Sequence, residues 1–590
     1  MILPYILSLI FILGLLLITL VPVYATLARR RPSTTKDNVP AGDIGPAATN
    51  KWLNVIRFIF GAICIVAVGF HGYWSLFAAG PVSSNDKYVS LMNGRDRRNL
   101  RLDEGGLRGW VYDRSNNPDS ALARYRFNGS TIDRVYPLGP AAAHLTSNPT
   151  GRGGIEQAFN AILTQPVSAY NELVSTLPVG KDIQTSIVAD LQRDVAQQFQ
   201  GKKAGAAVVV DVTTGEVLAM TSWPTFDPSV KLDNETKDKQ LYEHDHFPEI
   251  SPTVNRALEF YYRPGSTFKT FIAAVAVAEG KTNLVFECKH EGFTPPGSGR
   301  AINDYEGEVH GHIGFEDAFK VSCNQYFAQL GLALGKSTIA QHAQALGLSI
   351  DPDNAAVRGD PNIWSVDPAI QKDFNSVFAP PQSQMNLTSK VTPYDIALQS
   401  FGQGYDSITV LEMAILAAAV ARPDGNIPYL KFTTGGETKI RGTFLPAPAA
   451  AHLRQMMRLV VTNGTAAGAF NGCPVNVAGK TGTADRDVRV FDPKTRQPVK
   501  RQDEKGREYT VTTGQVDGWF IGFAPYENPK IAFAVVVEAG GQGAKSAAPI
   551  AKEIVIRASQ LGLFANAPAT QPANKPQTKN GKKAPGGTVR

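Results

Sequence analysis

Residues 263–270 have the sequence RPGSTFKT and lead directly into an apolar run that ends before Gly280. The Pro-Gly pair interrupts the chain just before this run, so the pattern predicts a helix over residues 268–279 with Ser266 at its N-terminus. Ser266 and Lys269 are three residues apart, which places both side chains on one face. A serine hydroxyl becomes a good nucleophile when a neighbouring base removes its proton, and a desolvated lysine is such a base. On its own, the pattern also fits a capping serine followed by a solvent-exposed lysine.

A second polar group follows 56 residues later, in the sequence Ser322-Cys323-Asn324. Residues 316–334 have a helical pattern, and the group lies at the junction of two helical stretches. A hydroxyl and a carboxamide two residues apart can project from one turn, where the first relays a proton and the second holds a substrate amide. The alternative is an ordinary polar helix start.

A third group, residues 478–484, has the sequence AGKTGTA and continues an extended apolar run. Glycine in a strand often marks the close approach of another backbone or a ligand, and an edge strand can pair with a bound peptide. Lys480, Thr481 and Thr483 then offer a carboxylate one charge and two hydroxyl donors. The alternative is a glycine-rich hairpin with a solvent-exposed lysine.

Apolar patterning around these groups predicts strands, then helices, then strands. The expected strands cover residues 206–212, 217–220, 475–484, 519–523 and 531–537, and the expected helices lie between residues 258 and 422, including 316–334 and 410–422. This order predicts an α+β fold in which an antiparallel sheet closes around a helical insert. Residues 485–511 are charged and are expected to form an exposed hairpin.

The three groups together, Ser-x-x-Lys, Ser-x-Asn and Lys-Thr-Gly in this order, resemble the set shared by β-lactamases and penicillin-binding proteins. Over about residues 105–560 the chain resembles a class B, transpeptidase-only penicillin-binding protein. Further stretches agree with that family: residues 108–114, 153–156, 214–216, 310–311, 401–404 and 519–525. The resemblance implies a five-stranded antiparallel sheet flanked by helices with a helical subdomain, preceded by a small pedestal.

The resemblance also implies a role for each residue. Ser266 would be acylated by the D-Ala-D-Ala end of a stem peptide, or by a β-lactam, with Lys269 as its base. Ser322 would pass a proton to the departing D-Ala nitrogen, and Asn324 would orient the peptide. Lys480, with Thr481, Gly482 and Thr483 after it, would bind the substrate carboxylate. The backbone amides of Ser266 and Thr483 would form the oxyanion hole. No cofactor or metal is expected.

Three other functions share the motifs. A β-lactamase or β-lactam sensor would hydrolyse the acyl-enzyme. No glutamate occurs between Glu316 and Glu412, which argues against class A, but a class D enzyme, with a modified lysine at the position of Lys269, stays open. A D,D-carboxypeptidase would use water in place of the acceptor amine. A non-catalytic cell-wall scaffold would have no physical need for the complete set. A nucleic-acid-binding function is disfavoured, because the net charge of +7 comes from the basic residues of 29–57 and 565–590.

Two apolar segments predict membrane spans, since each is long enough to cross a hydrocarbon core of about 30 Å. For the first segment, the alternative is a cleaved signal or a buried helix. The basic loop between them is expected in the cytoplasm and the catalytic part outside, at the cytoplasmic membrane. The predicted organisation is transmembrane helices 1–28 and 58–79 around the loop 29–57, a pedestal 80–180, a transpeptidase domain 181–564 and a disordered basic tail 565–590. The resemblance implies a polytopic glycan polymerase as partner. Cys288, Cys323 and Cys473 permit one disulfide at most.

Overall fold

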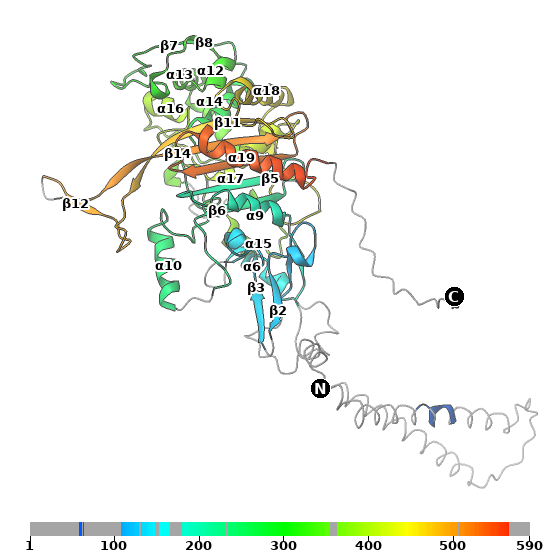
Figure 1. Ribbon diagram of the computed structural model, residues 1–590. Helices are drawn as coiled ribbons and strands as arrows, with labels where there is room; N and C mark the ends of the chain where they lie inside the picture. The colour runs from blue at the N-terminus through cyan, green and yellow to red at the C-terminus, as the bar shows by residue number, and fades with distance from the viewer. Residues whose placement is uncertain are drawn as a thin grey trace, which may run out of the picture. The chain divides into compact units, whose positions relative to one another are not determined.

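The computed structural model (Figure 1) describes a large part of the 590-residue chain. The described residues are 58–61, 63, 108–128, 131–147, 153–165, 180–230, 234–354, 363–504 and 507–565. They divide into two compact units: an N-terminal unit within residues 1–110, 124–135 and 161–182, and a main unit within residues 111–123, 136–160 and 183–590. The predicted pedestal and transpeptidase boundaries stay predictions.

Most of the two predicted membrane spans lies outside the described residues. Within the second span only residues 58–61 and 63 are described, and they are helical. No helix in the described part of the chain is both long and apolar enough to span a bilayer.

A five-stranded antiparallel sheet forms the centre of the main unit, in the order β11-β14-β15-β5-β6. Its strands are β5 (Ala204–Asp211), β6 (Val217–Trp223), β11 (Ala478–Arg489), β14 (Thr512–Ala524) and β15 (Ile531–Glu538). The pairing of β15 with β5 joins the early and late strands, so the predicted antiparallel sheet closed around a helical insert is confirmed. Strands β5 and β15 are apolar and buried except at their last residues, the half-buried Asp211 and the buried Glu538, as expected for strands covered on both faces.

Helices cover both faces of this sheet. Helices α9 (Ala189–Gln197) and α19 (Gly543–Gln560) contact each other and lie in front of the sheet in Figure 1. Helix α17 (Val410–Ala421) contacts β15, β5 and β14 and also α18, so it lies between the sheet and the helical part of the fold. Every residue of α17 is buried, which agrees with a helix that is apolar all round.

The insert forms the helical subdomain beside β11 (Figure 1). It contains η5 (Gly265–Phe268), α11 (Lys269–Ala278), β7 (Val285–Cys288), η6 (Tyr305–Gly307), β8 (Gly311–Gly314), α12 (Phe315–Val321), α13 (Asn324–Leu334), α14 (Lys336–Leu346), α16 (Pro393–Gln399) and α18 (Ala447–Asn463). The helix predicted from Phe268 is present as η5 and α11. The pattern over 316–334 is split into α12 and α13, with Ser322 and Cys323 between them.

Shorter elements complete the described chain. They are β1 (Val111–Tyr112), η3 (Pro118–Ser120), η4 (Gly139–Ala142), α5 (Ala143–Thr146), α6 (Gly154–Ala158), α7 (Asn160–Leu163), β4 (Ile183–Gln184), α10 (Asn234–His246), η7 (Pro352–Asn354), α15 (Gln371–Phe378), β9 (Asn426–Pro428) and β10 (Ile440–Thr443). In the N-terminal unit, β2 (Arg124–Asn128) and β3 (Thr131–Val135) pair as an antiparallel hairpin.

The expectation of a solvent-exposed hairpin over residues 485–511 is only half right. Its outer part, β12 (Lys500–Gln502) and β13 (Glu508–Thr510), is an exposed antiparallel pair. Its inner part extends β11 and β14, and there Arg486 is largely buried and forms ion pairs with Asp517 and Glu538. The prediction was wrong for Arg486 because the two acidic partners are distant in sequence and become neighbours only through sheet pairing.

Candidate active site

Ser266 lies in η5, at the point where the chain turns into the buried helix α11. Gly265 before it has a φ of +53°, a conformation that residues with a Cβ rarely adopt. A Cβ at this glycine would also lie 2.4 Å from the carbonyl oxygen of Thr483. The glycine therefore permits the serine-bearing turn to approach β11 at the third motif.

The amino group of Lys269 lies at the centre of the site. Its Nζ is 3.0 Å from Ser266 Oγ, 2.7 Å from Asn324 Oδ1 and 3.1 Å from Ser322 Oγ, and it donates to the Ser322 carbonyl oxygen at 2.5 Å. The side chain is fully buried. One ammonium or amine nitrogen thus contacts the first and second motifs at once.

Burial lowers the pKa of Lys269 from 10.5 to about 8, because the charged form loses its hydration. A neutral amine has two N–H donors and one lone pair. The Ser322 carbonyl and Asn324 Oδ1 can accept the two N–H groups, which leaves the lone pair for the hydroxyl of Ser266. The contacts around the nitrogen therefore fit a base poised to take the serine proton.

Ser322 occupies a strained position between α12 and α13. Its φ of 66° and ψ of 39° place it in the left-handed region, which is uncommon for a residue other than glycine. This backbone turn directs the Ser322 carbonyl and hydroxyl to Lys269, while Asn324 begins α13 and turns its carboxamide to the same nitrogen.

Lys480, in β11, contacts the same hydroxyl. Its Nζ donates to Ser322 Oγ at 2.9 Å and to the Thr481 carbonyl at 3.1 Å. Burial, together with the nearby charge of Lys269, holds its pKa well below the usual value. The lysine is fully buried, so in this structure it faces Ser322 and does not line the open cleft.

The rest of the third motif forms one wall of that cleft. Gly482 packs directly on η5, where an added Cβ would lie 2.8 Å from Thr267 Cγ2. Thr481 and Thr483 flank it and line the cleft. The structure thus brings together all eight residues predicted for the site, while their individual roles stay predictions.

The cleft itself has a volume of about 270 Å³. It is lined by Ser266, Asp304, Tyr305, Glu308, His310, Val321, Ser322, Asn324, Phe401, Gln403, Thr465, Thr481, Gly482, Thr483, Asp485, Gln542, Gly543 and Ala544. Four parts of the main unit therefore meet around one opening: η5, the rest of the helical insert, β11 and the start of α19. An extended peptide laid along β11 would present its carbonyl groups to Ser266.

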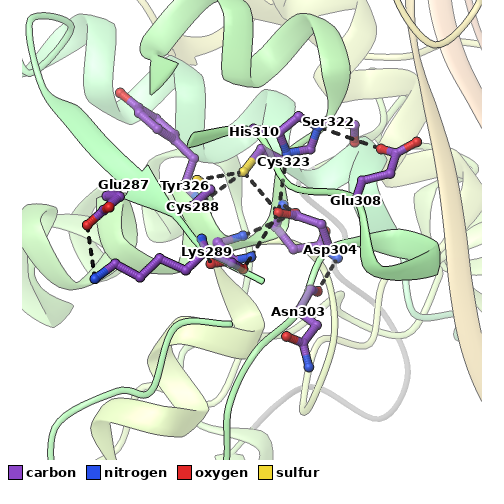
Figure 2. Close-up of polar contacts among 12 residues, drawn as sticks. Glu287, Cys288, Lys289, Asn303, Asp304, Glu308, His310, Ser322, Cys323 and Tyr326 are labelled. Atoms are coloured by element: carbon purple, nitrogen blue, oxygen red, sulfur yellow. Dashed lines mark hydrogen bonds and ion pairs between the residues drawn. The ribbon is translucent and has the colours of Figure 1, made fainter. Parts of the chain in front are cut away.

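Asp304 is a residue of the site that the sequence did not reveal (Figure 2). Its carboxylate accepts hydrogen bonds from the backbone N–H groups of Asn324 and Gln325 and from the Gln325 side chain. His310 Nδ1 lies 3.3 Å from the same carboxylate. A carboxylate at a helix N-terminus is stabilising, so Asp304 fixes the start of α13 and with it Asn324. No local sequence pattern signals this role.

One group of side chains in the described residues has the composition of a metal site. Ligand atoms of Cys288, Asp304 and Cys323 lie within 4.8 Å of one another, and all three residues are buried. The Asp304 carboxylate, however, already accepts the helix N–H groups, and a metal would compete with these for its oxygens. These three side chains are therefore poorly suited to bind a metal ion.

Comparison with known proteins agrees with the fold and the motifs. Residues 205–555 match the family model described as the penicillin binding protein transpeptidase domain. The chain is 28% identical over 467 residues to the peptidoglycan D,D-transpeptidase PbpA of Mycolicibacterium smegmatis, a match that covers 73% of this chain and 84% of that protein. It is 26% identical over 483 residues to the peptidoglycan D,D-transpeptidase MrdA of Acinetobacter baumannii, with 73% and 67% covered.

Among solved structures, penicillin-binding protein A of Mycobacterium tuberculosis, determined as a ceftriaxone acyl-enzyme complex, has a TM-score of 0.60 and 23% identity to this chain. The match covers 76% of this chain and 98% of that one. At this identity the likeness shows a shared fold, with the five-stranded antiparallel sheet and its flanking helices.

Proposed function

The chain belongs to the penicillin-binding protein transpeptidase family, and on that premise we propose that it is a class B peptidoglycan D,D-transpeptidase. It cross-links stem peptides through an acyl-enzyme on Ser266. The observation that carries the proposal is the position of Lys269 Nζ, within 3.1 Å of the hydroxyls of both Ser266 and Ser322 and beside the carboxamide of Asn324. The names of the relatives PbpA and MrdA support the same reaction.

Acylation begins when Ser266 Oγ attacks the carbonyl carbon of the penultimate D-Ala. Its proton passes to Lys269, whose lone pair faces the hydroxyl. The backbone amides of Ser266 and Thr483 stabilise the developing oxyanion, and the loss of one such donor typically costs about 3 kcal/mol of transition-state stabilisation. Asn324 orients the peptide, and the strand at Thr481, Gly482 and Thr483 pairs with it and receives its terminal carboxylate.

Departure of the terminal D-Ala needs a proton on its nitrogen. Ser322 Oγ lies between Lys269 and Lys480, 3.1 and 2.9 Å from their nitrogens. The proton taken from Ser266 can therefore pass through the Ser322 hydroxyl to the leaving group. Lys480 supports this transfer from beneath the cleft, and a substrate carboxylate at the Thr481 edge of β11 favours its protonated form, whose charge then acts on that carboxylate. A stem-peptide amine then attacks the acyl-enzyme and forms the cross-link.

The proposal also includes the location of the enzyme at the membrane and its partner. Residues 1–28 and 58–79 anchor the chain in the cytoplasmic membrane with the catalytic unit on the outer side, where peptidoglycan is found. A polytopic glycan polymerase supplies the nascent strands. The charge pattern supports this topology, because basic residues concentrate between the two apolar segments.

Covalent labelling by a fluorescent penicillin tests the nucleophile. We expect labelling of the wild type and of Ser229→Ala, which alters an exposed serine outside the cleft, and no labelling of Ser266→Ala. Intact-protein mass and peptide mapping then place the adduct. Equal labelling of the Ser266→Ala variant would remove this residue from the mechanism.

Two further assays separate the remaining functions. Rapid steady-state turnover of a chromogenic cephalosporin would indicate a β-lactamase, whereas slow deacylation is expected here. With paired stem peptides, a cross-linked dimer is the expected product; release of D-Ala without a dimer would indicate a carboxypeptidase. If the protein neither is acylated by penicillin nor forms a cross-linked dimer or free D-Ala, the non-catalytic scaffold would be the remaining function.

A further inference from the structure

Two cysteine thiols, one of them inside the second motif, contact each other (Figure 2). Cys288 ends β7 and Cys323 lies between α12 and α13, and their Sγ atoms are 3.0 Å apart. Both residues are at most 1% exposed. The separation exceeds the length of a disulfide bond by only about 1 Å, so a bond needs a small movement of two side chains that already face each other.

The surroundings tolerate loss of the thiol protons. Cys323 Sγ accepts from the backbone N–H of Tyr326 at 3.3 Å, an interaction that a disulfide sulfur retains. Its S–H also donates to Asp304 at 3.4 Å, but the Asp304 carboxylate keeps its donors from Asn324 and Gln325 without it. The hydrogen bond between the thiols lowers the pKa of Cys288, despite its burial.

We propose that Cys288 and Cys323 are joined by a disulfide that positions the second motif for catalysis. This inference rests on the proposed function, because it needs an exported, oxidising location and a reaction that uses Ser322 and Asn324. During folding after export, before the two thiols are buried, Cys288 attacks a disulfide of a thiol–disulfide oxidoreductase and forms a mixed disulfide. Cys323 then attacks Cys288 Sγ and displaces the oxidoreductase. Two protons and two electrons leave the cysteine pair, one S–S bond forms, and the oxidant's disulfide becomes two thiols.

The cross-link would act on the motif because of where Cys323 lies. It is the residue between Ser322 and Asn324, and it follows the strained left-handed turn. The Cys288 end is anchored, since β7 pairs with β8 and Cys288 lies opposite Gly311. A covalent tie from this hairpin to Cys323 restricts the turn that aims Ser322 and Asn324 at Lys269. Cys288 and Cys323 are thus positioning residues.

The cross-link is tested on the full chain, exported and purified without reductant. Maleimide alkylation under denaturing conditions, followed by mass measurement, should modify two of the four cysteines, and all four after reduction. Peptide mapping without reduction should recover one linked pair, containing Cys288 and Cys323. Modification of all four cysteines without reduction, a link through Cys473, or one equivalent of tightly held zinc would overturn the proposal.

The positioning role is tested by the second-order rate constant for acylation by a fluorescent penicillin. Reduction should slow the wild type by about tenfold, within the range expected when a catalytic group is displaced by a fraction of an ångström. Cys473→Ser should respond in the same way, whereas Cys288→Ser should be slow with or without reductant. Equal rates for oxidised and reduced wild type would refute the positioning role. A protein that carries the cross-link but is never acylated would instead refute the proposed function.

Discussion

The neutral fraction of Lys269 should control how fast Ser266 is acylated, and Asn324→Asp tests this with a nearly isosteric change. The substitution places a carboxylate where Oδ1 now lies 2.7 Å from Lys269 Nζ. A negative charge at this distance stabilises the ammonium form and should raise the pKa of Lys269 by one unit or more. The base would then be protonated over more of the working pH range.

The size of the effect follows from the pKa of about 8 in the wild type. At pH 7.5 a base with that pKa is about 24% neutral, and raising its pKa to about 9 leaves about 3%, so acylation should slow about eightfold. A lysine with an unperturbed pKa would be only about 0.1% neutral at the same pH. The burial of Lys269 thus accounts for more than a hundredfold in available base.

Stopped-flow acylation by a fluorescent penicillin, measured from pH 6 to 10, provides the assay. The wild-type rate should rise with pH and level off above a midpoint near 8. The midpoint of Asn324→Asp should move upward, and its rate should approach a plateau at high pH. Asn324→Ala serves as the control, because it removes the carboxamide without adding charge and should lower the plateau with little shift of the midpoint.

Three results would refute the reasoning. A pH-independent wild-type rate would mean that no group with a pKa near 8 limits acylation. A midpoint near 10.5 would mean that burial leaves the pKa of Lys269 unchanged. Equal midpoints for Asn324→Asp and Asn324→Ala would mean that the titrating base is not the amine beside residue 324.

Three further substitutions test the structure around the site. Glu538→Gln removes the buried acid that pairs with Arg486 and should destabilise the fold by about 3–5 kcal/mol in thermal unfolding. Burial opposes ionisation of Glu538, but the arginine charges keep its pKa below 4.5, so its contribution is present above that pH and is lost as pH falls. Burial raises the pKa of Asp406, and its carboxyl oxygens have no hydrogen-bond partner among the described residues. The Asp406 carboxyl loses its proton at lower pH in the unfolded chain than in the folded one, so the free energy of unfolding falls as pH rises from about 4. Asp406→Asn should therefore raise the free energy of unfolding by about 1–3 kcal/mol at pH 7.5. An unchanged melting temperature would contradict this. Gly482→Ala should slow acylation at least tenfold, because its methyl group would lie 2.8 Å from a carbon of η5, whereas Gly514→Ala, with open space around it, should keep the wild-type rate.

Local features of the fold and site could be predicted because a few neighbouring residues determine them. Pro264 and Gly265 mark a turn before an apolar run, and they do precede η5 and α11. The alternation and composition around Lys480 indicate a strand, and β11 is present. Each of these predictions used information within about ten residues, the range over which hydrophobic periodicity and turn chemistry operate.

The remaining features depend on contacts between distant residues. Asp304 orients Asn324 from 20 positions earlier in the chain, through hydrogen bonds that exist only once the insert has folded. The left-handed turn at Ser322 is imposed on a residue whose own preference lies elsewhere. Burial of Lys480 beneath the motif likewise depends on the packing of α12 against α18 and of α18 against β11. No pattern along the sequence carries these relations.

In the proposed function, the two buried lysines would connect substrate recognition to activation of the nucleophile. Their nitrogens both contact Ser322 Oγ, and the charge of Lys269 is one reason why the pKa of Lys480 is low. Because the repulsion is mutual, a protonated Lys480 lowers the proton affinity of Lys269 in turn. In the proposed function, a substrate carboxylate at the Thr481 edge of β11 would favour the charged form of Lys480. Its arrival would then shift Lys269 toward the neutral amine when Ser266 needs a base, and a ligand without the carboxylate would gain no such effect.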